Sequence, residues 1–232
     1  MDWQPPQKPA EIAESRLLAA ILSGRFPING TLPAERELAV QIGVTRPTLR
    51  EVLQRMARDG WLDIQHGKPT RVRDYWREGN LGVLAALAQS PAHPLPDFIT
   101  YLLELRILLA PAYARQALEQ APSAIAALLE DHASLPDDPS AFARFDWDLH
   151  IGLTRLARNP VFQLLYNGFH DLSVLMGEHY FAFPECRQSS RRFYAALLVC
   201  ARGGDAAGAE VLVRRVMEES LALWQKMQKE NV

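Results

Sequence analysis

The stretch from Leu32 to Arg73 constrains the fold of this chain most, because it contains two short helical patterns with a turn between them. In residues 35–42, the apolar side chains of Leu38 and Ile42 are four positions apart, so they lie on the same side of a helix. Gly43 follows, and glycine often ends a helix because it tolerates a positive φ angle. The pattern predicts a helix over residues 35–42.

A second helix is predicted to begin directly after Thr45 and to end at Gly60. Threonine is a favourable N-cap. Pro47 falls in the first turn, where the missing N–H is not needed. Four apolar residues then recur at helical spacing and predict one buried face: Leu49, Val52, Leu53 and Met56.

Residues 61–65 and 70–73 alternate between apolar and polar side chains, and they predict the two strands of a small hairpin. The sequence His-Gly-Lys-Pro connects them and gives the hairpin a basic tip. Helix, turn, helix and hairpin in this order predict a winged helix-turn-helix, which we place in residues 1–74.

The charge of this stretch indicates binding to nucleic acid. Residues 36–73 contain eight Lys or Arg and four Asp or Glu, a net charge of +4, whereas the whole chain has a net charge of −2. Arg46, Thr48 and Arg50 cluster at the N-terminal end of the second helix, which enters the major groove in helix-turn-helix proteins. Arginine reads guanine there through O6 and N7. The alternative is a small helical subdomain with a solvated charged face, but the hairpin after the helix pair favours DNA binding.

The composition predicts a cytoplasmic protein that does not span a membrane. The 232 residues, 48% of them hydrophobic, suffice for one large or two ordinary domains with a sizeable core. Cys186 and Cys200 have neither metal-type nor CxxC spacing. The N-terminus lacks the apolar segment of a signal peptide, and no apolar run approaches the roughly 18 residues that indicate a membrane span.

Helical patterns dominate from residue 81 to the end of the chain, while residues 75–80 are predicted to be a linker. The linker region contains a Tyr-Trp pair that we expect to pack against a neighbouring domain. We therefore expect a mainly α protein, with an all-α bundle of about seven helices in residues 81–232. The expected helices cover residues 81–89, 97–120, 123–135, 141–157, 160–179, 189–201 and 205–229.

Several long phrases of the sequence resemble the GntR superfamily of regulators. In the first domain these are PAERELA, IGVTRPTLREVLQRMARDGWL and QHGKPTRV. In the helical bundle, FARFDWDLHIGLTRLARNP, GEHYFAFPE and LWQKMQK are similar to the FadR subfamily, so the resemblance covers essentially the whole chain.

The resemblance implies contacts with operator DNA, with the wing at the minor groove. The implied contact residues are Arg36, Thr45, Arg46, Thr48, Arg50, His66, Gly67 and Lys68. The chain departs from the FadR subfamily at Pro47, where threonine is usual. Because proline donates no hydrogen bond, a contact at this position would be lost or replaced.

Asp146 and His150 are four positions apart and therefore project from the same side of a helix. Many relatives of this domain hold a divalent metal with Asp and His here and with two further histidines. This chain has Tyr194 and Val216 where those histidines would fall. Two ligands make a poor metal site, so both residues are weak candidates and we expect no metal. The alternative is a hydrogen-bonded pair beside a cavity.

The last helical pattern places Ser220 on an apolar stripe, with Trp224 one turn away. A hydroxyl group in this position fits either an ordinary core or the wall of a ligand cavity. The family resemblance favours the cavity, since both residues match positions that bind long-chain acyl-CoA, and Arg106 and Tyr194 also match cavity positions. The chain departs from the subfamily at two further ligand positions, which are Val216 and Met217.

The resemblance implies a homodimeric transcription factor that binds double-stranded operator DNA. It would repress fatty-acid degradation genes and activate synthesis genes, and long-chain acyl-CoA would release it from DNA. The alternative within the same class is a regulator that senses a small organic acid through a metal in the helical domain. The sequence contains no GxSxG, P-loop or dinucleotide-binding motif, so we expect no enzymatic activity.

Overall fold

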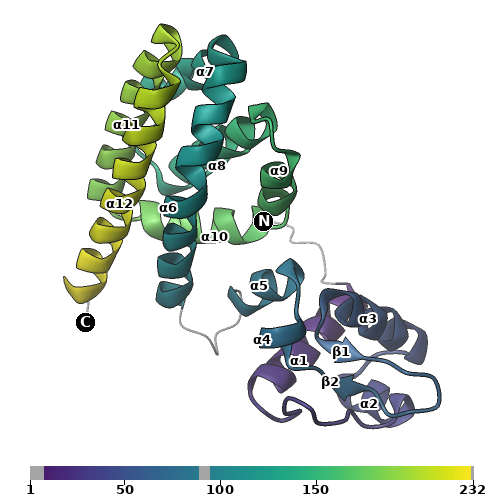
Figure 1. Ribbon diagram of the computed structural model, residues 1–232. Coiled ribbons are helices and arrows are strands. Elements are labelled where there is room, and N and C mark those ends of the chain that lie inside the picture. The colour runs from purple at the N-terminus through teal and green to yellow at the C-terminus, as the bar shows by residue number, and fades with distance from the viewer. Residues whose placement is uncertain (1–7, 89–94, 231–232) are drawn as a thin grey trace. The chain divides into compact units, whose positions relative to one another are not determined.

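The computed structural model describes residues 8–88 and 95–230. The chain divides into two compact units, Met1–His93 and Pro94–Val232. Figure 1 shows the helices of both units and the small hairpin of the first. The structure confirms a mainly α fold with a short β-hairpin in its N-terminal part.

The N-terminal unit contains the predicted winged helix-turn-helix. Its two strands are antiparallel and pair Leu62 with Val72 and Asp63 with Arg71, so the hairpin is shorter than predicted. The elements are α1 (Pro9–Leu22), α2 (Glu35–Ile42), α3 (Arg46–Asp59), β1 (Leu62–Asp63), β2 (Arg71–Val72), α4 (Tyr75–Glu78) and α5 (Leu81–Ala88).

Local signals fix the ends of the helix pair. Gly43 ends α2 with a φ angle of 80°, and Gly60 ends α3 with a φ angle of 95°. Both angles lie in the left-handed region that favours glycine. α1 packs against α3, and Leu17 and Leu49 are fully buried in the core of this unit.

Residues of the predicted linker pack against the end of α3 and the segment that follows it. The ring of Tyr75, in the predicted linker, packs 4.8 Å from the ring of Trp61. Asn80 donates its side-chain amide to the carbonyl oxygen of Arg58 at 2.8 Å, near the C-terminal end of α3. The segment from residue 75 to residue 80 therefore packs against the end of α3, and Tyr75 docks on a neighbouring ring as expected of the aromatic pair.

The C-terminal unit consists of long helices and one short 3-10 segment. α6 and α12 lie side by side, and α8 packs against α10 (Figure 1). The elements are α6 (Leu95–Gln120), α7 (Pro122–Leu129), the 3-10 helix η1 (Glu130–Ser134), α8 (Pro139–Leu156), α9 (Pro160–Asn167), α10 (His170–Phe181), α11 (Pro184–Gly203) and α12 (Ala206–Glu230).

Three predicted helices in this unit differ from the structure. The helix expected over residues 123–135 ends at Leu129 and is followed by the 3-10 helix η1. The helix expected over residues 160–179 is divided into α9 and α10, with Gly168 as the C-cap of α9. α11 begins at Pro184 rather than at Ser189, because proline fits the first position of a helix. In the part of the chain that is described, no helix is both long and apolar enough to cross a membrane.

Candidate DNA-binding face and buried cavity

The N-terminal end of α3 carries the first set of predicted DNA contacts. Arg46 and Pro47 are the first two residues of the helix, and both are exposed. The hydroxyl of Thr45 accepts a hydrogen bond from the Thr48 N–H at 3.3 Å and lies 2.9 Å from the Thr48 hydroxyl. Thr45 is therefore the N-cap, as predicted. The two threonine hydroxyl groups are within hydrogen-bond distance of each other at the start of the helix, where Arg46 also lies.

An ion pair joins α2 to α3. Arg50 lies one turn beyond Arg46 and donates Nε to Oε2 of Glu35 at 2.6 Å. Arg36 follows Glu35 in α2, and its side chain is exposed. Exposed arginines on both helices can neutralise phosphates and reach base edges, which are the two contacts that a DNA-reading helix needs.

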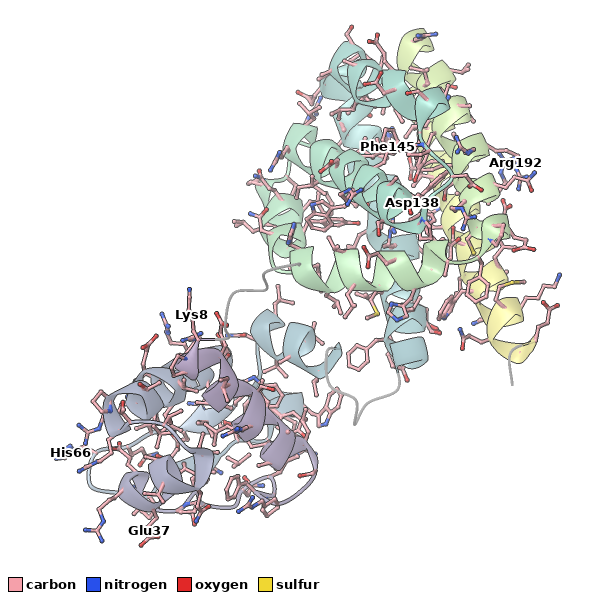
Figure 2. The ribbon with its side chains drawn as sticks, turned by 180° about the vertical axis from the view of Figure 1, so that it is seen from behind. Lys8, Glu37, His66, Asp138, Phe145 and Arg192 are labelled. Carbon is pink, nitrogen blue, oxygen red and sulfur yellow. The ribbon has the colours of Figure 1, made fainter. Side chains whose placement is uncertain are left out.

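The wing carries the second set of predicted contacts. Gly67 has a φ angle of 73°, which lets the chain turn at the tip of the hairpin. Lys68 closes this turn, since its N–H donates to the carbonyl oxygen of Gln65 at 3.2 Å and its Nζ donates to the Gln65 side chain at 2.8 Å. His66 points outward from the unit (Figure 2). The tip therefore presents His66, Gly67 and Lys68 at the surface.

The C-terminal unit contains a cavity of about 70 Å³. Among the described residues, its walls come from α6, α8, α9 and α10 and from Phe169. Most lining side chains are apolar or aromatic, and Arg106 and Asp146 are the charged pair among them. An apolar cavity with a few convergent polar groups is the usual form of a small-molecule site.

Asp146 is the most constrained charged group at this cavity. Its carboxylate accepts a hydrogen bond from Arg106 at 2.8 Å and another from the Tyr194 hydroxyl at 3.1 Å. Burial is the largest single influence and would raise the pKa of Asp146. The positive charge of Arg106, together with His150 and the hydrogen bonds from Arg106 and Tyr194, outweighs burial and holds the pKa below its usual value. The pair is therefore ionised at neutral pH inside a largely apolar wall.

His150 lies between Asp146 and two tyrosines and belongs to the same polar cluster. Its Nδ1 lies 2.5 Å from the Tyr113 hydroxyl, which in turn lies 2.5 Å from the Tyr166 hydroxyl. Its Nε2 is buried, has no hydrogen bond to any residue that the structure describes, and faces Oδ1 of Asp146 at 3.7 Å. Burial and the Arg106 charge lower the pKa of His150 to about 3, against the opposing effect of Asp146. His150 is therefore neutral at physiological pH.

The lowered pKa of His150 predicts that acid destabilises the helical unit. Below pH of about 6.5 the unfolded chain protonates this histidine while the folded chain does not, so the free energy of unfolding falls as the pH falls towards 3. Between pH 7 and pH 5 the expected loss is about 2 kcal/mol. Urea unfolding at both pH values measures it, with the variant His150→Asn as the comparison. An identical pH dependence in the variant would contradict the assignment.

The six predicted ligand residues are placed differently. Arg106 lines the cavity. Tyr194 is not among the described lining residues, but its hydroxyl donates to Asp146, which lines the cavity. The remaining four are buried on α12 and are not among the described residues that line it: Val216, Met217, Ser220 and Trp224. The ring of Trp224 lies 6.3 Å from the ring of Tyr180, which does line the cavity.

Three tyrosines of this site were missed in the sequence analysis. The Tyr113 hydroxyl is hydrogen-bonded to His150 and to the Tyr166 hydroxyl, and Tyr180 lines the cavity beside Trp224. No sequence signal pairs Tyr113 with Tyr166, because they lie 53 positions apart.

Asp146 and His150, the weak metal candidates, lie on the same side of α8 as expected. Arg106 places its guanidinium on Asp146, and Tyr113 contacts His150. In the described ranges, no group of three or more His, Cys, Asp or Glu residues is arranged to hold a metal ion. The pair therefore belongs to the hydrogen-bonded cluster beside the cavity.

A winged helix with a basic reading helix, joined in one chain to a helical unit with a buried cavity, defines the class of DNA-binding transcription regulators. Residues 9–72 match the family model of bacterial regulatory proteins of the gntR family. Residues 73–231 match the model of the FadR C-terminal domain. The chain belongs to the GntR family, in the group that carries a FadR C-terminal domain. Members of this family regulate transcription and are not enzymes.

Individual relatives agree with this assignment. The fatty acid metabolism regulator protein of Klebsiella pneumoniae (strain 342) is 42% identical over 223 residues, which are 96% of this chain and 93% of the relative. The protein of the same name from Escherichia coli O1:K1 / APEC is 42% identical over 224 residues, again 96% of this chain and 93% of the relative. The solved structure of Lar, described as controlling the expression of the Listeria monocytogenes agr system, is 15% identical with a TM-score of 0.62. The match covers 96% of this chain and 99% of that one, and it shows a shared fold.

Proposed function

We propose that this chain is a regulator of fatty-acid metabolism that binds operator DNA and leaves it when long-chain acyl-CoA enters the helical unit. One observation carries the proposal: the chain is 42% identical, over 96% of its length, to proteins named as fatty acid metabolism regulators. Identity at this level extends over both units, so it supports a common DNA-binding role and a common class of effector.

The DNA contacts come from the reading end of α3 and from the wing. Arg46 and Arg50 enter the major groove, where a guanidinium can donate two hydrogen bonds to guanine. His66 and Lys68, at the tip of the wing, contact the neighbouring minor groove. The protein acts as a homodimer, because two copies related by two-fold symmetry match the two half-sites of a palindromic operator.

The cavity supports an effector with an apolar chain. Its volume of about 70 Å³ is well below the roughly 300–1,000 Å³ of ordinary ligand sites, so a long acyl chain has to displace the lining side chains. The ligand then binds one packing of the helical unit much better than another. Such differential affinity is what a ligand needs to shift a protein between two states.

The response at a promoter depends on where the operator lies. The protein bound to its operator represses fatty-acid degradation genes and activates synthesis genes, and acyl-CoA reverses both effects. The same release step accounts for both directions, since it lowers the occupancy of the operator in each case.

A gel shift with the promoter of a fatty-acid gene tests the proposal. We expect a shifted band that disappears with oleoyl-CoA but persists with coenzyme A alone. The absence of a shifted band with every such promoter would contradict the proposed DNA binding. A shift that ignores oleoyl-CoA, but is relieved by a small carboxylate together with a divalent metal, would replace the effector with the organic-acid alternative.

Replacing Arg46 with alanine is expected to weaken operator binding by about 1–3 kcal/mol, because a bidentate contact with a base is lost. Titration of the labelled promoter with the variant measures this loss. Arg202→Ala removes the same charge from an exposed position at the end of α11 and serves as the control. Equal losses in the two variants would mean that Arg46 contributes only net charge.

A further inference from the structure

The surface formed by α2 and the N-terminal end of α3, which is proposed to bind DNA, contains the carboxylate of Glu35. Negatively charged DNA phosphates would repel this group. Glu35 is the first residue of α2, and its side chain is 37% exposed. Arg36 follows it directly, and Arg50 lies against it from α3. An acidic group at a DNA surface repels phosphates, so its presence there needs a compensating role.

The contact between Glu35 and Arg50 is specific in its geometry. Oε2 of Glu35 accepts from Nε of Arg50 at 2.6 Å, while the Arg50 side chain remains 61% exposed. Among the described residues, the two terminal nitrogens of Arg50 have no hydrogen bond. A guanidinium that is held through Nε keeps its orientation and still offers both terminal nitrogens to a second partner.

We propose that Glu35 is a positioning residue that determines operator specificity by holding Arg50 for a bidentate contact with guanine. A long arginine side chain on a helix surface samples many rotamers and loses that freedom when it binds a base. The ion pair to α2 removes much of the freedom beforehand. It therefore favours the fixed guanine edge, with acceptors at O6 and N7, over the phosphates that any DNA presents.

A structural role is the simple alternative, because acidic residues stabilise the first turn of a helix. Glu37 provides the matched control. It lies in the same first turn of α2, and its side chain is exposed (Figure 2). Among the described residues, Arg50 forms its ion pair with Glu35 and not with Glu37. Alanine at either position removes one negative charge and the same helix-end interaction, but only alanine at residue 35 releases Arg50.

The experiment compares the affinity of the full-length protein for a promoter fragment that the wild type shifts with its affinity for a random duplex of equal length. Loss of a negative charge alone strengthens binding to both duplexes by a similar factor, which leaves their ratio unchanged. We expect Glu35→Ala to lower the ratio on the order of tenfold, and Glu37→Ala to keep it within about twofold. Glu35→Gln, which retains an acceptor for Nε, is expected to fall between them.

A double-mutant cycle separates positioning from folding. In an Arg50→Ala background, Glu35→Ala is expected to leave the ratio unchanged, since there is no guanidinium left to hold. A further fall of the ratio in that background, or equal ratios for Glu35→Ala and Glu37→Ala, would overturn the proposal. The inference rests on the proposed operator binding, but the two fail differently. Absence of any specific shift by the wild type removes operator binding, whereas a normal shift with an unchanged ratio in Glu35→Ala removes only the role of Glu35.

Discussion

Replacing Asp146 with leucine is expected to lower the free energy of unfolding of the helical unit by about 3 kcal/mol. The substitution leaves the Arg106 guanidinium beside an apolar cavity without its counter-charge, and Tyr194 loses its acceptor. Removing one partner of a buried ion pair typically costs about 3–5 kcal/mol. The lower end applies here because the Arg106 side chain is still 27% exposed and can partly reach water.

Urea unfolding of the full chain, combined with hydrogen exchange of peptides from α8 and α11, measures this loss in the unit concerned. Glu119→Ala is the control, because it breaks the exposed ion pair between Arg115 and Glu119 and should cost less than about 0.5 kcal/mol. Equal losses for Asp146→Leu and Glu119→Ala would show that the buried pair of Arg106 and Asp146 contributes no more to stability than an exposed ion pair does.

The double variant Arg106→Met, Asp146→Leu is expected to recover much of the stability that either single variant loses. Both charges are then absent, and apolar side chains of similar size line the cavity. A double variant as unstable as the sum of both single variants would refute the coupling between Arg106 and Asp146.

The winged helix could be predicted because its boundaries are set by nearby residues. Gly43, Thr45 and Gly60 act through their own backbone conformation or through a bond to a residue three positions away. Pro184 is a signal of the same kind, because proline fits the first position of a helix and α11 begins there. The break between α9 and α10 lacks such a signal, since Gly168 has an ordinary φ angle of −74°.

The cavity could not be predicted from spacing because its walls come from four separate helices, of which α6 is separated from α8, α9 and α10 by α7 and η1. The sequence did place Asp146 and His150 on one side of a helix. Their real partners, Arg106 and Tyr113, lie 40 and 37 positions away, where periodicity says nothing about contact. Resemblance to a family indicated Arg106 and Tyr194 as cavity positions. It also indicated Ser220, which the structure places on α12, outside the described lining of the cavity.

Replacing Gly60 with alanine is expected to destabilise the N-terminal unit by about 3 kcal/mol, for two separate reasons. The φ angle of 95° is unfavourable for a residue with a side chain, which costs about 1–2 kcal/mol. The added Cβ would also lie only 2.7 Å from Cα of Gly79 and 3.0 Å from the carbonyl oxygen of Glu78. Both contacts are with backbone, which cannot move aside as a flexible side chain does, and overpacking of this kind costs about 1–3 kcal/mol.

Gly67→Ala separates the two reasons, because it keeps the first and lacks the second. Gly67 has a φ angle of 73°, but no described heavy atom lies within 4 Å of an added Cβ, so the expected cost is only about 1–2 kcal/mol. Hydrogen exchange of the α3 amides in the full chain compares the two variants in the same unit. A larger loss for Gly60→Ala would mean that the approach of residues 78–79 to the end of α3 contributes to the stability of the DNA-reading helix. Equal losses would mean that this segment can move away from α3 at little cost, and that Asn80 does not hold it there.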